Sequence, residues 1–306
     1  MKHIYGPVPS RRLGFSLGLD LVPYKICSFD CVYCQLGKTT LKTVVRKIHV
    51  PYRKIIDELK DVLKQKKKID YITISGSGEP TLNLDIGKLI YEIKKLTSIP
   101  VAVLTNSSLF SDPLLRKQIL SSDLVVPSLD AVSPEVFRKI DRPHKSIKIN
   151  EIVNGLVKFR KVYKGKIYLE IMLVKGINDN LKEIKKLKEA LLKIKPDKIH
   201  LNLPVRPPQE KNIFPPDKEK LLKIKSLLGE KAEIIYLKKP GKEQSHTTDT
   251  EKEILELIKR RPVTLKDICD SLGLNENEAI KYTQVLIDNK LAKTKYYQER
   301  RYFIPK

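Results

Sequence analysis

The feature of this 306-residue chain that most restricts its fold is a regular alternation of short apolar segments with amphipathic ones. The apolar segments are rich in Val, Ile and Leu, and the intervening segments repeat their apolar residues at helical spacing. Near-continuous apolar strands separated by helices indicate a parallel sheet that is covered on both faces. We expect strands at 16–22, 70–75, 101–105, 123–130, 167–174 and 198–205, and helices at 52–65, 84–96, 150–159 and 180–194.

These segments predict six strand–helix units joined by right-handed crossovers. Six units are too few to close an eight-stranded barrel of alternating strands and helices. We therefore expect an α/β fold, a partial (βα)6 barrel of the TIM type, over residues 1–237. A further helix and strand within 217–236 are expected to cover the edge of the sheet.

The character of the chain changes after this predicted barrel. Residues 238–250 include no apolar residue and are rich in turn formers, so we interpret them as a linker. Residues 251–306 predict a small second domain with three helices followed by two strands joined by a tight turn. This order of elements resembles a winged helix-turn-helix domain.

The net charge indicates a polyanionic partner. The chain carries 60 Lys and Arg against 36 Asp and Glu, a formal charge of +24, and such a surplus favours RNA or DNA as a partner. The alternative is a lysine-rich surface of the kind seen in thermophile proteins. Residues 1–250 carry +21 and residues 251–306 carry +3, of which 290–306 hold six basic residues and one acidic residue.

Three of the four cysteines lie within eight residues, at Cys27, Cys31 and Cys34, directly after the first expected strand. A structural zinc site needs a fourth ligand, and neither a nearby histidine nor the distant Cys269 supplies one. Iron–sulfur clusters also favour thiolate ligands. A four-iron cluster on three cysteines has one iron left to bind a substrate or cofactor. We expect Cys269 to be a buried, inert thiol.

The spacing C-x3-C-x2-C, with Tyr33 before the last cysteine, resembles the signature of the radical S-adenosylmethionine superfamily. The alternative for such a loop is a zinc site or a redox-active thiol. The resemblance implies a [4Fe-4S] cluster on Cys27, Cys31 and Cys34, with S-adenosylmethionine as the second cofactor. It also implies reductive cleavage of that cofactor to a 5′-deoxyadenosyl radical, which takes a hydrogen atom from the substrate.

Further polar residues follow the expected strands. The segment SGSGEPTLN (75–83) resembles the glycine–glutamate–proline motif of the superfamily, although many relatives have two adjacent glycines there. The resemblance implies cofactor contacts for Gly76 and Gly78, which let the backbone approach a ligand, and for Glu79, which can accept a hydrogen bond from an ammonium group. The alternative for this segment is an ordinary turn at the end of a strand.

The resemblance extends to the ends of the next two strands and to the cysteine loop. It implies that Asn106, Ser128 and Asp130 contact the methionyl carboxylate and the ribose, and that Tyr33 contacts adenine. Helix capping is the alternative for the three strand-end residues. Arg206 follows the sixth strand, at the end of the barrel where substrates bind, so it is a candidate for a substrate anion or simply an exposed arginine.

Residues 1–240 resemble a branch of the superfamily related to the tRNA wyosine synthases, but no cysteine precedes Cys27 to hold the second cluster of those enzymes. We therefore expect modification of RNA, most plausibly tRNA, without tricyclic-base synthesis. One alternative is radical activation or modification of a protein or peptide. Another is a cluster-dependent DNA-binding regulator, which would not need Glu79.

The expected partners and location follow from the same features. The resemblance implies an electron donor such as a ferredoxin or flavodoxin. No apolar run approaches the roughly 20 residues that span a bilayer, and the first residues lack the apolar segment of a secretory signal. We therefore expect a cytoplasmic protein with no membrane partner.

Overall fold

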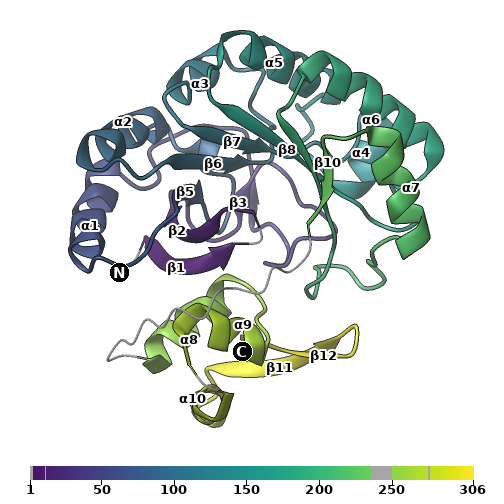
Figure 1. The fold of residues 1–306 in the computed structure, drawn as a ribbon. Coiled ribbons are helices and arrows are strands. Elements are labelled where there is room, and N and C mark those ends of the chain that lie inside the picture. Colours follow the sequence, from purple (N-terminus) through teal and green to yellow (C-terminus); the bar gives the residue numbers. More distant parts are fainter. Residues whose placement is uncertain (1–2, 11, 236–249, 275) are drawn as a thin grey trace.

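The computed structural model is built on one eight-stranded sheet, and it describes residues 3–10, 12–235, 250–274 and 276–306 (Figure 1). The strand order is β1-β2-β5-β6-β7-β8-β9-β10, and all neighbours are parallel except β1 and β2. The expected α/β fold with a mostly parallel sheet is therefore confirmed. The strands are β1 (Ile4–Ser10), β2 (Gly14–Asp20), β5 (Tyr71–Ser75), β6 (Val101–Thr105), β7 (Leu124–Pro127), β8 (Lys166–Met172), β9 (Lys198–Asn202) and β10 (Ala232–Ile234).

The sheet is open, because β1 and β10 are its two edges and do not pair with each other. The helices lie along its outer face, so that its inner face is left to the polar side chains of the barrel interior (Figure 1). The helices and the one 3-10 turn of this part are α1 (Tyr52–Lys64), η1 (Pro80–Leu82), α2 (Ile86–Leu96), α3 (Pro113–Gln118), α4 (Pro134–Ile140), α5 (Ile149–Val162), α6 (Leu181–Ile194) and α7 (Lys218–Leu228).

The six expected parallel strands are all present, with shifted ends, and α7 and β10 are the helix and strand expected within 217–236. The elements that were not expected include β1, α3 and α4. Strand β1 contains Gly6, Pro7 and Pro9, which interrupt any strand pattern and are tolerated because β1 is an edge strand. Helices α3 and α4 have only six and seven residues, which is too short for an apolar repeat to be recognised.

The last part of the described chain, residues 250–306, has its own apolar core, and we refer to it as the C-terminal unit. It contains the expected three helices and two antiparallel strands: α8 (Thr250–Arg260), α9 (Leu265–Leu272), α10 (Glu276–Asp288), β11 (Ala292–Tyr297) and β12 (Arg300–Pro305). Ile258, Ile268 and Phe303 are among its buried residues. Apart from Thr250, the linker expected at 238–250 lies outside the described residues.

The C-terminal unit lies against the open side of the barrel (Figure 1). At one edge, an Arg260 nitrogen lies 3.5 Å from the Asp20 carboxylate, and its guanidinium lies 4.0 Å from the centre of the Tyr5 ring. On the opposite side, the Tyr302 hydroxyl donates to the carbonyl oxygen of Val205, in the loop after β9, at 2.5 Å. The unit therefore extends across the open side from β1 and β2 to the loop after β9.

No helix of the described residues is both long enough and apolar enough to cross a membrane.

The separate core of the C-terminal unit leads to a stability prediction. Ile258 on α8 is fully buried, so Ile258→Ala is expected to lower the free energy of unfolding of this unit by about 2–5 kcal/mol, because it leaves a cavity. Denaturant titration followed by circular dichroism measures the change. The matched control is Ile280→Ala on α10, where the side chain is 50% exposed. Equal effects of the two substitutions would contradict the assigned core.

Candidate functional site

The three neighbouring cysteines lie in a loop that the protein holds in place. Cys27 ends the two-residue strand β3 (Ile26–Cys27), which pairs with β4 (Leu41–Lys42). The loop that follows is anchored by backbone hydrogen bonds from Asp30 and Val32 to the carbonyl oxygens of Asp141 and Ile140, at 3.0 and 2.9 Å. The thiols are free and half-buried. These backbone contacts therefore fix the shape of the cysteine loop.

Each of the three sulfurs contacts a polar side chain from a different part of the chain. Lys25 Nζ lies 3.1 Å from Cys34 Sγ, Asn106 Nδ2 lies 3.4 Å from Cys27 Sγ, and Cys31 Sγ lies 3.4 Å from Asp141 Oδ1. The lysine and the aspartate were not among the residues expected from the sequence. A buried lysine two residues before a cysteine motif is a signal that sequence reasoning could have used.

The surroundings of two of the thiols disfavour a negative charge on them. Burial raises the pKa of Cys27 to about 12, with the nearby Glu79 carboxylate as a further cause. Burial also raises the pKa of Cys31 well above its usual value, and Asp141 adds to this. Burial disfavours the charge on Lys25, but the Cys34 sulfur outweighs it and raises the pKa of the lysine. Thiolates in this loop therefore gain from a positive centre beside them.

The ligand set suits a cluster better than a single ion. Among the described residues, no group of three His, Cys, Asp or Glu side chains is close enough together to hold one metal ion. In an iron–sulfur cluster each cysteine binds a different iron, so its ligands are spread more widely than those of a zinc ion. Three cysteines in one anchored loop, with a lysine beside them, fit such a cluster.

Glu79 is the centre of a group of buried hydrogen bonds next to the cysteine loop, which we call the Glu79 frame. The residue is only 2% exposed. Its Oε1 accepts hydrogen bonds from the Thr81 backbone and hydroxyl, at 3.1 and 2.6 Å, and from the Thr105 hydroxyl at 2.7 Å. Its Oε2 accepts from the Asn106 N–H at 2.7 Å. Burial raises the pKa of Glu79, and these hydrogen bonds oppose that rise. The carboxylate thus accepts four hydrogen bonds from protein donors.

The two glycines of the motif allow the chain to pack against itself. Gly76 has a φ of +129°, and a Cβ there would lie 2.2 Å from Asp20 Oδ1. At Gly78 a Cβ would lie 2.1 Å from the carbonyl oxygen of Ile26, the residue before Cys27. The close approach predicted toward a ligand is thus, in this structure, an approach to the neighbouring protein segments.

Four of the expected cofactor contacts lie together at the strand ends. Tyr33, Asn106, Ser128 and Asp130 line one cleft, which also contains Asp141. The Tyr33 hydroxyl donates to Asp130 Oδ2, while Asp130 Oδ1 accepts from the Met172 N–H at 2.7 Å. Burial raises the pKa of Asp130 to about 6.

The cleft has a volume of about 10 Å³, close to what one water molecule needs. A nucleoside therefore enters it only if the Tyr33 side chain and its neighbours move apart.

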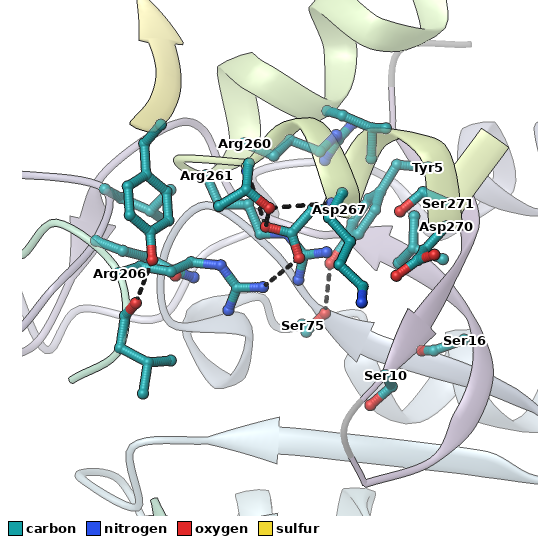
Figure 2. A pocket seen from close by; sticks show the side chains of 18 of the residues that line it. Tyr5, Ser10, Ser16, Ser75, Arg206, Arg260, Arg261, Asp267, Asp270 and Ser271 are labelled. Atoms are coloured by element: carbon teal, nitrogen blue, oxygen red, sulfur yellow. Dashed lines mark hydrogen bonds and ion pairs between the residues drawn. The ribbon is translucent and has the colours of Figure 1, made fainter. Parts of the chain in front are cut away.

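Arg206 lies in the wall of a much larger cavity, of about 760 Å³, between the inner face of the sheet and the C-terminal unit (Figure 2). Its side chain is only 8% exposed, and a guanidinium nitrogen lies 3.6 Å from Asp267 Oδ1 on α9. Gln35 and Leu36, which directly follow Cys34, line the same cavity. The structure therefore places Arg206 apart from the strand-end cleft, in a cavity that extends to the residues directly after Cys34.

Comparison with protein families gives one match. The family model described as "Radical SAM superfamily" matches residues 21–188, a segment that includes the cysteine loop and the strand-end cleft. The UPF0026 protein MJ1312 of Methanocaldococcus jannaschii is 37% identical over 298 residues, which cover 95% of this chain and 92% of that protein.

Two further relatives have more specific names. A "Probable dual-specificity RNA methyltransferase RlmN" of Thermotoga petrophila is 30% identical over 68% of this chain and 61% of its own length. A "GTPase Obg" of Brachyspira hyodysenteriae is 39% identical over 94% of this chain, but the chain spans only 43% of that relative's length. The phosphate-binding motif of many GTPases requires a glycine five residues before its Gly-Lys-Ser/Thr. Val32 occupies that position before Gly37, where this sequence has its one such tripeptide.

A solved structure has the same type of fold. The radical SAM methyltransferase from Sphaerobacter thermophilus superimposes with a TM-score of 0.54 at 15% identity, over 72% of this chain and 66% of that one.

The frame around Glu79 leads to a second stability prediction. In Glu79→Gln, one acceptor oxygen becomes an NH2 group that faces a buried donor, so the free energy of unfolding is expected to fall by about 1–3 kcal/mol. Thermal unfolding measures the loss. The control Glu189→Gln, at an exposed position on α6, is expected to leave the melting temperature unchanged. A melting temperature of Glu79→Gln equal to that of the control would disprove the bracing role.

Proposed function

Because the chain belongs to the radical SAM superfamily, we propose that it is an enzyme that modifies RNA, with tRNA as the preferred substrate. It is an S-adenosylmethionine-dependent iron–sulfur enzyme, and its cofactors are a [4Fe-4S] cluster and S-adenosylmethionine. When bound, the two cofactors supply a 5′-deoxyadenosyl radical, through reductive cleavage of S-adenosylmethionine, for removal of a hydrogen atom from the substrate.

The observation that carries the RNA proposal is the similarity to the RNA methyltransferase of Thermotoga petrophila over 68% of the chain. The charge of the chain supports it, because a formal +24 favours a polyanionic substrate and speeds its diffusional encounter. The C-terminal unit, which we propose to be a winged-helix domain after a barrel of residues 1–237 and a linker of 238–250, adds the basic segment 290–306.

We propose the following roles for the residues of the site. Cys27, Cys31 and Cys34 hold the cluster, and the Lys25 ammonium group offsets part of the thiolate charge. The residues of the strand-end cleft bind S-adenosylmethionine after Tyr33 has moved from Asp130. The motif around Glu79 holds the cysteine loop and the strand-end cleft in a fixed position relative to each other. The cleft and frame residues are Tyr33, Gly76, Gly78, Glu79, Asn106, Ser128 and Asp130. A ferredoxin or flavodoxin supplies the electron.

The cysteine assignment predicts the metal content of single variants. Anaerobically reconstituted wild-type protein is expected to hold about four irons per chain. Cys27→Ala, Cys31→Ala and Cys34→Ala are each expected to lose most of this iron, because no other cysteine lies in the loop. Cys269→Ala, on α9 in the C-terminal unit, is the matched control and is expected to keep it. Full iron content in Cys31→Ala would show that the ligand assignment is wrong.

The RNA proposal is tested by a reaction and by a comparison of cells. Reconstituted protein with dithionite, S-adenosylmethionine and bulk tRNA is expected to release 5′-deoxyadenosine and to produce a nucleoside of altered mass. RNA from cells that lack the gene is expected to miss the same nucleoside by mass spectrometry. Release of 5′-deoxyadenosine with unchanged nucleosides in both experiments would overturn RNA as the substrate and leave the superfamily chemistry standing.

A further inference from the structure

The cavity of about 760 Å³ between the barrel and the C-terminal unit has a size typical of ligand sites, which span about 300–1,000 Å³ (Figure 2). The barrel wall includes residues on β1, β2 and β5 and in the loop after β9, which carries Arg206, and the other wall includes residues on α8, α9 and β12. The cavity therefore exists only because the C-terminal unit covers the open side of the barrel.

The lining of this cavity has an excess of positive charge. Seven basic and three acidic side chains line the cavity, and two of the basic ones, Arg12 and Arg260, pair with Glu170 and Asp20, which are not lining residues. The C-terminal unit as a whole is nearly balanced in charge. Positive charges gathered around an enclosed space repel one another and favour an anion between them. The basic residues are Arg12, Arg206, Arg260, Arg261, Lys266, Arg300 and Arg301.

Two of these arginines come from opposite walls and have incomplete partners. Arg206 and Arg260 each lie 3.5–3.6 Å from one carboxylate, that of Asp267 and Asp20 respectively. These contacts are longer than the roughly 2.7–2.9 Å of a strong charge-assisted hydrogen bond. The Nε atoms of both arginines are buried and have no hydrogen-bond partner among the described residues. Their side chains are only 8% and 14% exposed, and Arg260 also lies over the Tyr5 ring.

The remaining wall suits a polar ligand that reaches the cysteine loop. The hydroxyls of Ser10, Ser16 and Ser75 lie on the barrel side of the cavity (Figure 2). Gln35 and Leu36 also line it, one and two residues after Cys34. A ligand held by the arginines at the domain boundary therefore has a path to the loop that we propose to hold the cluster.

We propose that this cavity binds one nucleotide of a single-stranded RNA segment, with its phosphodiester group between Arg206 and Arg260. The inference rests on the proposed function and specifies its substrate site. A phosphate gives each guanidinium a two-point contact that the single carboxylates do not give. Unstacked nucleotides are taken into enclosed pockets by other base-modifying enzymes. The C-terminal unit contributes Arg260, so the substrate site is incomplete without it.

The test is the salt dependence of RNA binding to the full-length, reconstituted protein. The probe is a short, mixed-sequence, fluorescently labelled single-stranded RNA, and anisotropy gives the dissociation constant at several salt concentrations. Each lost phosphate contact lowers the slope of log affinity against log salt by about 0.7 for a single strand. The double variant Arg206→Gln/Arg260→Gln removes the one proposed phosphate contact, so it is expected to lower the slope by about 0.7 and to weaken binding at least about tenfold at low salt.

The matched control removes the same charge from the outer surface. Lys182→Gln/Lys188→Gln, at exposed positions on α6, is expected to keep the wild-type slope and affinity. Wild-type binding by the arginine variant, or an equal loss in the lysine variant, would overturn the proposal and show that RNA binds through diffuse surface charge.

A second variant covers the case in which the glutamine substitutions disturb docking of the C-terminal unit. Arg206→Lys/Arg260→Lys keeps both charges and the ion pairs but cannot make two-point contacts, so it is expected to bind RNA more weakly with the wild-type slope. Wild-type affinity in this variant would contradict the proposal. If tRNA is modified at the wild-type rate by the glutamine variant, the cavity assignment fails while the proposed function stands. If the arginine variants lose RNA binding but the wild-type protein modifies no RNA, the cavity assignment stands while the proposed function fails.

Discussion

A single buried carboxylate, that of Glu79, joins the three segments on which the cysteine site is built. The Glu79 backbone N–H donates to the carbonyl oxygen of Ile26, the residue before Cys27, at 3.0 Å. The Glu79 side chain caps η1 and accepts hydrogen bonds from Thr105 and Asn106 at the end of β6. Through Asn106 the same network reaches the Cys27 sulfur. An unpaired buried carboxylate is strongly unfavourable, so its four donors and the segments that carry them are tied to one arrangement.

This frame places two unlike sites at the same end of the sheet. The strand-end cleft beside Tyr33 has room for about one water molecule. The cavity beside Gln35 has a volume of about 760 Å³ and a mostly basic lining. The cysteine loop contributes Phe29 and Tyr33 to the cleft, and Gln35 and Leu36, which directly follow Cys34, line the cavity. Hydrogen-atom transfer requires that cofactor and substrate be held close together, and the proposed sites meet this requirement in so far as residues of the cysteine loop and those directly after it line both spaces.

The sequence allows the parallel sheet to be predicted because most of its strands are short apolar segments rich in Val, Ile and Leu that alternate with regular helices. Strand β1 could not be predicted, because Gly6, Pro7 and Pro9 interrupt the residue pattern of a strand. The cysteine loop and the polar strand ends are also visible in the sequence. Their partners are not: Asp141 meets a cysteine 110 residues earlier, and Arg260 meets Asp20 across 240 residues. Such contacts are properties of the folded chain, and no local pattern records them.

The central claim is that three cysteines leave one iron of the cluster free to bind S-adenosylmethionine. Electron paramagnetic resonance of the reduced, reconstituted protein, recorded with and without S-adenosylmethionine, tests it most directly. The spectrum is expected to change when the cofactor is added, because its amino and carboxylate groups would become ligands of that iron. An identical spectrum in the presence of saturating S-adenosylmethionine would contradict the claim.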